Sequence, residues 1–148
     1  MKVLIADDEP VHTFLLEMFL KKWGYEVTST DNGEEALQIL LGESFPDLAI
    51  LDWMMPKLEG VEVCRRVKNV FGKANIYILL LTAKAQVVDR QKAFGSGADD
   101  YMTKPYDPEE LRCKLLKGCQ IIKSKQRGTH QSSRSSVTAR SATSIQEE

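Results

Sequence analysis

The sequence predicts an α/β fold built on a doubly wound, five-stranded parallel sheet with strand order 2-1-3-4-5. Short apolar runs alternate with segments of helical periodicity through residues 1–123, which is typical of successive β-α units. The runs are continuously apolar and therefore fit strands that are buried on both faces. Right-handed crossovers and short connections then favour a sheet with helices on both sides.

The first unit is a strand over residues 3–6 followed by a helix over residues 10–24. Pro10 suits the first helical turn and Gly24 suits the position after the helix end. The helix is predicted from apolar residues that share one face: Val11, Phe14, Leu15, Met18 and Phe19.

The second unit pairs a weaker strand, "YEVTST" (25–30), with a helix over residues 32–42. Asn32 is expected to cap this helix, acids occupy its first turn, and Gly42 follows its end. The remaining units are strands at 48–51, 76–81 and 99–103, followed by helices at 59–72, 85–96 and 107–123.

The composition changes near residue 123. Residues 124–148 hold seven serines and three threonines but no Phe, Trp or Tyr. Such a segment buries too little apolar area to offset its ordering entropy. We therefore expect a domain over 1–123 and a flexible Ser/Thr-rich tail or linker over 124–148.

The net charge, the lengths of the apolar runs and the cysteine count exclude several classes of function. A net charge of −1 makes no electrostatic case for nucleic acid or membrane partners. No apolar stretch approaches the ~20 residues of a membrane span, and the start becomes acidic too early for a signal peptide. Three cysteines without a CxxC pair are expected to be reduced thiols in a cytoplasmic protein.

Polar residues stand where four of the predicted strands end. Asp7 and Asp8 follow the first strand, Asp52 the third, Thr82 the fourth and Lys104 the fifth. Carboxyl ends of parallel strands meet at one edge, where sites form at the reversal of strand order. Three converging carboxylates without His or Cys indicate Mg²⁺ rather than zinc.

Each of these signals has a plain structural explanation when taken alone. An acidic run before Pro10 is a favourable helix entry, Thr82 can cap the next helix, and Lys104 can be a solvated turn residue. Their joint placement at one edge of one sheet favours chemistry. A carboxylate beside a metal and a lysine can act as a nucleophile and form an aspartyl phosphate.

Four stretches resemble the receiver domains of two-component response regulators: "ADDEP", "LDWMMPKLEG", "LLLTAKA" and "GADDYMTKPYDPEELRCKL". The resemblance covers about residues 2–122 and implies a flavodoxin-like (βα)5 fold. It also implies a phosphorylation-dependent signalling switch rather than an enzyme, with only self-catalysed phosphoryl transfer and slow dephosphorylation.

The resemblance assigns roles at the carboxyl edge. Asp52 matches the phosphoacceptor, which takes its phosphoryl group from a sensor histidine kinase or phosphotransfer protein. Asp8 matches the direct Mg²⁺ ligand, Asp7 the acid that holds the metal through water, and the backbone carbonyl of Met54 a further metal ligand.

Further matches concern the switch. Lys104 matches the lysine that contacts the phosphoryl group, and the Lys104–Pro105 bond is expected to be cis. Thr82 matches the switch hydroxyl, and Tyr101 the aromatic side chain that turns inward after phosphorylation. The surface of the fourth helix, fifth strand and fifth helix would then change for an output partner or a homodimer.

Two questions stay open about the extent of the protein and its output. The chain is either a stand-alone receiver or the front of a longer regulator with a nucleotide-cyclase or similar output domain. Direct DNA binding and membrane association are not expected. An aspartyl-phosphate phosphatase would need a second Asp where Met54 stands, and a flavodoxin would need a phosphate loop where Asp7 and Asp8 stand.

Several neighbouring residues have weaker interpretations. His12 is interpreted as a surface or capping histidine and Trp53 as a partly exposed rim residue, while Met54 or Met55 is expected to pack under the loop. An apolar Met54 and a cationic Lys84 lead us to expect a longer-lived phosphoryl group than in fast chemotaxis-type relatives.

Overall fold

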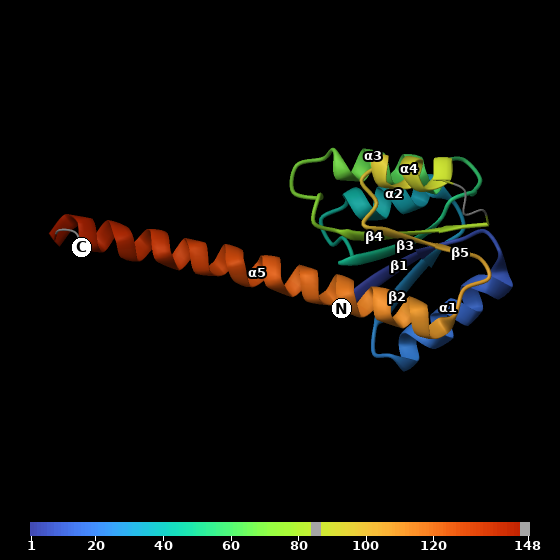
Figure 1. The fold of residues 1–148 in the computed structure, drawn as a ribbon, viewed down its shortest axis with the longest axis horizontal. Coiled ribbons are helices and arrows are strands. Elements are labelled where there is room, and N and C mark those ends of the chain that lie inside the picture. Colours follow the sequence, from blue (N-terminus) through green and yellow to red (C-terminus); the bar gives the residue numbers. More distant parts are fainter. Residues whose placement is uncertain (84–86, 146–148) are drawn as a thin grey trace.

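The computed structural model describes residues 1–83 and 87–145, and side chains for residues 1–83 and 90–126. Five β-α units follow one another without exception in this part of the chain (Figure 1). The elements are β1 (Lys2–Ala6), α1 (Pro10–Lys22), β2 (Glu26–Thr30), α2 (Gly33–Leu41), β3 (Leu48–Asp52), α3 (Gly60–Lys68), β4 (Tyr77–Thr82), α4 (Val87–Gly95), β5 (Asp100–Thr103) and α5 (Pro108–Ile145).

All strand pairs are parallel and the sheet order is β2-β1-β3-β4-β5, which confirms the predicted fold class. Helices α2, α3 and α4 cover one face of the sheet, and α1 and α5 cover the other (Figure 1). Since side chains alternate along a strand, β3 serves both layers. Leu48 and Ile50 pack toward α1 and α5, whereas Ala49 and Leu51 pack toward α2 and α3.

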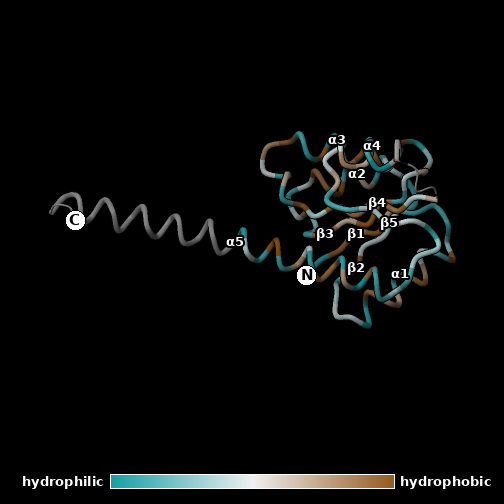
Figure 2. The backbone as a smooth tube through the Cα atoms, viewed as in Figure 1, coloured by the Kyte–Doolittle hydropathy of each residue, from teal (hydrophilic) through white to brown (hydrophobic). Residues whose placement is uncertain are grey.

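Apolar residues gather on the central strands (Figure 2), and buried residues of the helices pack against both faces of these strands. Helix α1 is the exception to the sequence interpretation, because the apolar face that predicted it is not the face that packs on the sheet. Leu16 and Leu20 are the buried residues of α1. The predicted face is largely exposed, at Val11, Phe14, Leu15 and Met18.

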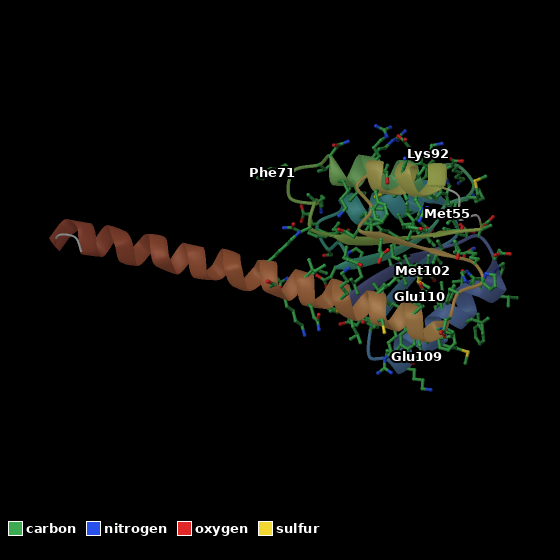
Figure 3. All side chains as sticks on the ribbon, viewed as in Figure 1. Met55, Phe71, Lys92, Met102, Glu109 and Glu110 are labelled. Carbon is green, nitrogen blue, oxygen red and sulfur yellow. The ribbon has the colours of Figure 1, made fainter. Side chains whose placement is uncertain are left out.

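Most of the predicted helix ends are confirmed. Pro10 begins α1, Gly24 follows it with a φ of +94°, and the Asn32 side chain accepts a hydrogen bond from the Glu35 N–H at 2.8 Å. Helix α3 is shorter than expected and ends at Lys68. Phe71 then projects from the α3–β4 connection and is fully exposed (Figure 3).

Helix α5 runs to Ile145 and projects beyond the sheet (Figure 1), so our expected helix end at residue 123 is wrong. No proline follows Pro108, and proline is the residue that interrupts a helix most strongly. Residues 146–148 lie outside the described residues. We keep the division of the chain at residue 123 as a proposal. None of the described helices combines the length and apolarity that a membrane crossing requires.

The inner part of α5 is fitted closely to β4. Leu111, Leu115 and Ile122 are buried against the sheet. Between them, a Cβ at Gly118 would lie 2.7 Å from the Tyr77 ring, which is too close for any larger residue without movement of the ring. The Tyr77 hydroxyl is buried and has no hydrogen-bond partner among the described residues.

Replacing Tyr77 with phenylalanine is expected to stabilise the protein, and more so at alkaline pH. Burial, assisted by the charges of Asp100 and Asp99, raises the pKa of Tyr77 to about 12, against about 10 in an unfolded chain. Below about pH 10 the phenol is neutral in both the folded and the unfolded chain, so it does not affect the pH dependence of stability. Between about pH 10 and 12 the unfolded chain loses this proton first, and the free energy of unfolding falls as the pH rises.

Removing the unpartnered hydroxyl should raise the free energy of unfolding by about 1 kcal/mol at neutral pH. Urea denaturation of wild type and Tyr77→Phe at neutral pH and between pH 10 and 12 measures the difference. A difference that does not grow with pH would contradict the assigned titration.

Candidate functional site

The polar residues predicted from the strand ends lie together at the carboxyl edge of the sheet. Asp7 directly follows β1, Asp52 and Thr82 are the last residues of β3 and β4, and Lys104 directly follows β5. One carboxylate oxygen from each of Asp7, Asp8 and Asp52 lies within 4.8 Å of the others. The adjacent strands β1 and β3 diverge here into different connections, which leaves room for the side chains.

The three carboxylates differ in burial and in protein contacts. Asp7 and Asp52 are 2% and 7% exposed, whereas Asp8 is exposed. Asp7 Oδ1 accepts the Glu9 N–H at 2.9 Å, and Asp7 Oδ2 faces both Lys104 and His12. Within the described residues, no hydrogen bond or ion pair engages the Asp8 carboxylate. Asp8 is therefore the carboxylate most available to a cation.

Lys104 places its ammonium among the acids. Its Nζ lies 3.2 Å from Asp52 Oδ2, 3.4 Å from Asp7 Oδ2 and 3.5 Å from Glu9 Oε1. Burial lowers the pKa of Lys104, but the charges of Asp52 and Asp7 raise it by more than burial lowers it. The pKa of Lys104 therefore lies above its ordinary value. The side chain is therefore a fixed positive charge at this edge.

The pKa values of the two buried acids move in opposite directions. Burial raises the pKa of Asp7, but the hydrogen bonds from His12 and Glu9 outweigh burial and bring it below the ordinary range. Burial also raises the pKa of Asp52, and Lys104 offsets this only in part. The ionised form of Asp52 is thus held at a cost, which a bound cation would reduce.

Thr82 and Tyr101 lie on the same face of the sheet. Leu80 is the register partner of Tyr101, and Thr82 follows Leu80 by two residues, so all three share one face. Thr82 is buried. Tyr101 is half-buried, with its ring edge-on to Phe94 at 5.7 Å between centroids. The switch roles of Thr82 and Tyr101 stay predictions.

The segment after Asp52 corrects one interpretation and confirms another. Trp53 is buried rather than a partly exposed rim residue, and its N–H donates to the Leu81 carbonyl at 2.8 Å. Met55 is buried with the core residues on the side of the sheet that α2, α3 and α4 cover (Figure 3), whereas the Met54 side chain is exposed. The metal-binding role of the Met54 carbonyl stays a prediction.

At Gly60 the loop that follows Asp52 packs back against the end of β3. Its N–H donates to the Trp53 carbonyl at 2.9 Å. A Cβ at this position would overlap the Asp52 carbonyl oxygen and lie 3.0 Å from the Asp52 carbonyl carbon. The absence of a side chain at Gly60 therefore allows the loop to close against the residue that carries the site.

Sequence reasoning missed the position of His12, which is not a surface or capping residue. Its Nδ1 contacts Asp7 Oδ2, and its side chain is 17% exposed. Its ring lies edge-on to Tyr106, with 5.5 Å between centroids. The available signal was the spacing from Pro10, which puts residue 12 in the first turn of α1, next to the end of β1.

The donor set fits Mg²⁺. Asp7, Asp8 and Asp52 supply only hard carboxylate oxygens, and Mg²⁺ prefers such ligands while keeping several waters. The exposure of Asp8 leaves a path for the ion from solvent. Lys84, which we expected to affect phosphoryl lifetime, lies outside the described residues.

Comparisons with known proteins agree with this geometry. A sequence profile described as response regulator receiver domain matches residues 3–116. The chain is 43% identical over 114 residues to the alkaline phosphatase synthesis transcriptional regulatory protein PhoP of Bacillus subtilis, covering 77% of this chain and 46% of PhoP. It is 40% identical to the DNA-binding dual master transcriptional regulator RpaA of Synechocystis, covering 77% of this chain and 47% of RpaA. The chain thus spans about half the length of these relatives.

Solved structures give the same relationship. A response regulator from Chloroflexus aurantiacus superposes with a TM-score of 0.72 at 34% identity, covering 82% of this chain and 96% of that one. The receiver domain of a sensor histidine kinase from Pseudomonas aeruginosa, with a magnesium ion in its active-site cleft, gives a TM-score of 0.70 at 28% identity. That match covers 78% of this chain and 94% of the other.

Proposed function

The chain belongs to the family of response regulator receiver domains, and from that premise we propose that it is a signalling switch operated by phosphorylation of Asp52. The observation that carries the proposal is the convergence of Asp7, Asp8 and Asp52 around Lys104. It unites a carboxylate nucleophile, oxygen ligands for a divalent cation and a fixed ammonium at one edge of the sheet.

In the proposed reaction, an Asp52 carboxylate oxygen attacks the phosphorus of a phosphohistidine on a sensor histidine kinase or phosphotransfer protein. The new O–P bond forms as the P–N bond breaks, and the histidine leaves with the bonding electron pair. Lys104, already 3.2 Å from Asp52 Oδ2, supplies positive charge to the transferred oxygens.

Asp8, Asp52 and the Met54 carbonyl would hold Mg²⁺ directly, and Asp7 would hold it through water. When bound, the ion supplies charge neutralisation for the transfer. The raised pKa of Asp52 fits this arrangement, because the metal-free site holds its ionised nucleophile at a cost.

The signal then passes through Thr82 and Tyr101. A phosphoryl group on Asp52 adds charge and acceptor oxygens, which would attract the Thr82 hydroxyl. Tyr101, half-buried beside Phe94 on the same sheet face, would move into the space that Thr82 vacates. The surface formed by α4, β5 and α5 would thereby change for an output partner or a second copy of the chain.

A second candidate is that the chain is part of a longer regulator, and the comparison with its relatives favours this possibility. PhoP and RpaA carry the names of transcriptional regulators, and this chain spans about half of each. RpaA is described as DNA-binding, which runs against our expectation of no direct DNA contact. A native product near the 16.7 kDa of this chain on a blot would favour the stand-alone receiver.

The chain would act as a signalling protein and not as an enzyme with an external substrate. We place it in the cytoplasm, where kinase phosphoryl donors act and where the free cysteines Cys64, Cys113 and Cys119 stay reduced. The match to transcriptional regulators supports this placement.

Incubation with acetyl phosphate and Mg²⁺ is expected to add the mass of one phosphoryl group to the wild-type protein and none to Asp52→Asn. The Asn variant should remain folded, because burial already disfavours the ionised form of Asp52. Asp31→Asn is a matched control, since Asp31 lines the same groove as Asp7 and Asp8 but does not belong to the carboxylate cluster. An adduct on Asp52→Asn, or none on wild type, would refute the proposed phosphoacceptor.

A further inference from the structure

His12 has an environment unlike that of a surface histidine. Its Nδ1 contacts Asp7 Oδ2, while its Nε2 is buried and has no hydrogen-bond partner among the described residues. Its ring lies edge-on to Tyr106 at 65° between planes. The ring is thus held between the metal-side carboxylate and the residues that follow β5.

The contact with Asp7 has a definite donor. An ionised carboxylate only accepts hydrogen bonds, and the Asp7 carboxylate already accepts the Glu9 N–H at Oδ1 and faces the Lys104 ammonium at Oδ2. The proton therefore lies on His12 Nδ1, which donates to Asp7 Oδ2. Helix α1 begins at Pro10, so the first turn of α1 supplies the donor.

Three donors hold the Asp7 carboxylate, two from the start of α1 and one from the segment after β5. The Glu9 N–H binds Oδ1 at 2.9 Å, and Lys104 lies 3.4 Å from Oδ2 beside His12. The Thr13 hydroxyl also donates to the Asp7 backbone carbonyl at 3.3 Å. Lys104 also lies 3.2 Å from Asp52 Oδ2, so its charge is divided between the two carboxylates. His12 is the side-chain donor at Oδ2 that is not shared with Asp52.

We propose that His12 is a positioning residue for Asp7 and that it strengthens the binding of a divalent cation at the carboxylate cluster. This inference rests on the proposed function, because it assumes that the cluster of Asp7, Asp8 and Asp52 holds Mg²⁺. The reason is general: hydrogen-bond partners that orient metal-binding side chains commonly contribute 10–100-fold to metal affinity.

A direct ligand role for His12 is the competing arrangement. Potential ligand atoms of Asp7, Glu9 and His12 also lie within 4.8 Å of one another. An imidazole ligand would favour Mn²⁺, Zn²⁺ or other transition metals over Mg²⁺. The two roles therefore differ in which metal loses affinity when His12 is replaced.

The test compares three substitutions by calorimetric titration of the full chain with Mg²⁺ and then with Mn²⁺. His12→Asn places an amide N–H where Nδ1 stands, His12→Gln places it where Nε2 stands, and His12→Leu removes the donor. We expect Leu and Gln to weaken Mg²⁺ binding by roughly tenfold and Asn to restore most of the affinity. Melting curves in metal-free buffer show whether each variant is folded.

Equal Mg²⁺ affinity for wild type and His12→Leu would overturn the proposal, as would rescue by Gln as complete as rescue by Asn. A loss confined to Mn²⁺ would also overturn it and assign His12 as a direct ligand. Failure of the proposed function is distinct, because wild type itself would then bind no Mg²⁺ and form no Asp52 adduct.

Discussion

Replacing Asp8 with alanine is expected to remove the stabilisation that Mg²⁺ gives to the wild-type protein. Asp7 is occupied by three protein donors and Asp52 by Lys104. Asp8 is exposed and engaged by no described residue, so its oxygens are free to coordinate directly. Its removal should therefore cost more metal affinity than the removal of any other single ligand.

At a Mg²⁺ concentration 100 times the dissociation constant, wild type should gain about 2.7 kcal/mol of unfolding free energy. Asp8→Ala should gain almost none at the same concentration. Without metal the variant should be slightly more stable than wild type, because Asp8 is one of the charges that disfavour ionised Asp52. Thermal or urea denaturation with and without Mg²⁺ measures both effects.

Asp31→Ala provides the comparison, since Asp31 lines the same groove as Asp7 and Asp8 without joining the carboxylate cluster. It should keep the full response to Mg²⁺. If Asp8→Ala kept that response as well, direct ligation by Asp8 would be wrong and the metal would have to depend on Asp7 and Asp52.

Replacing Gly60 with alanine is expected to destabilise the protein by about 3 kcal/mol, at the upper end of the range for overpacked sites. The added Cβ would overlap the Asp52 carbonyl oxygen, which is backbone and cannot rotate away. Either the end of β3 or the start of α3 must move. Because Asp52 is the last residue of β3, the movement should also slow phosphorylation by acetyl phosphate.

Gly95→Ala is the matched control, because a Cβ at Gly95 would meet no atom of the described residues within 4 Å. Gly95 is the last residue of α4, and alanine in place of glycine stabilises a helix by up to about 1 kcal/mol. Urea denaturation should therefore show a loss of unfolding free energy in Gly60→Ala and none in Gly95→Ala, and the rate of adduct formation should fall in Gly60→Ala alone. Similar unfolding free energies for the two variants would contradict the close approach at Gly60.

The sequence was sufficient for the fold and for the identities of the residues that meet at the carboxyl edge. Strand and helix periodicity define five β-α units, and right-handed crossovers leave few ways to arrange them. Residues that follow different strands must then share an edge. The convergence of Asp7, Asp52 and Lys104 follows from chain order alone.

The sequence was not sufficient where several packings satisfy one pattern. Helix α1 carries apolar residues around much of its surface, so periodicity predicts the helix without deciding that Leu16 and Leu20 face the sheet. Trp53 is buried by a loop that closes from Gly60, and residue type does not reveal that closure. The extension of α5 to Ile145 was likewise not predicted, because no periodic apolar pattern accompanies it.

The sequence by itself thus determined which fold forms and which acids lie beside Lys104. Both depend on the periodic pattern of apolar residues along the chain and on the parallel direction of the strands. Only the tertiary structure decided that His12 contacts Asp7, that no described residue engages the Asp8 carboxylate and that Gly60 must lack a side chain. Those features depend on distances between segments that are packed together, and hydrogen bonds and steric overlap change over fractions of an ångström.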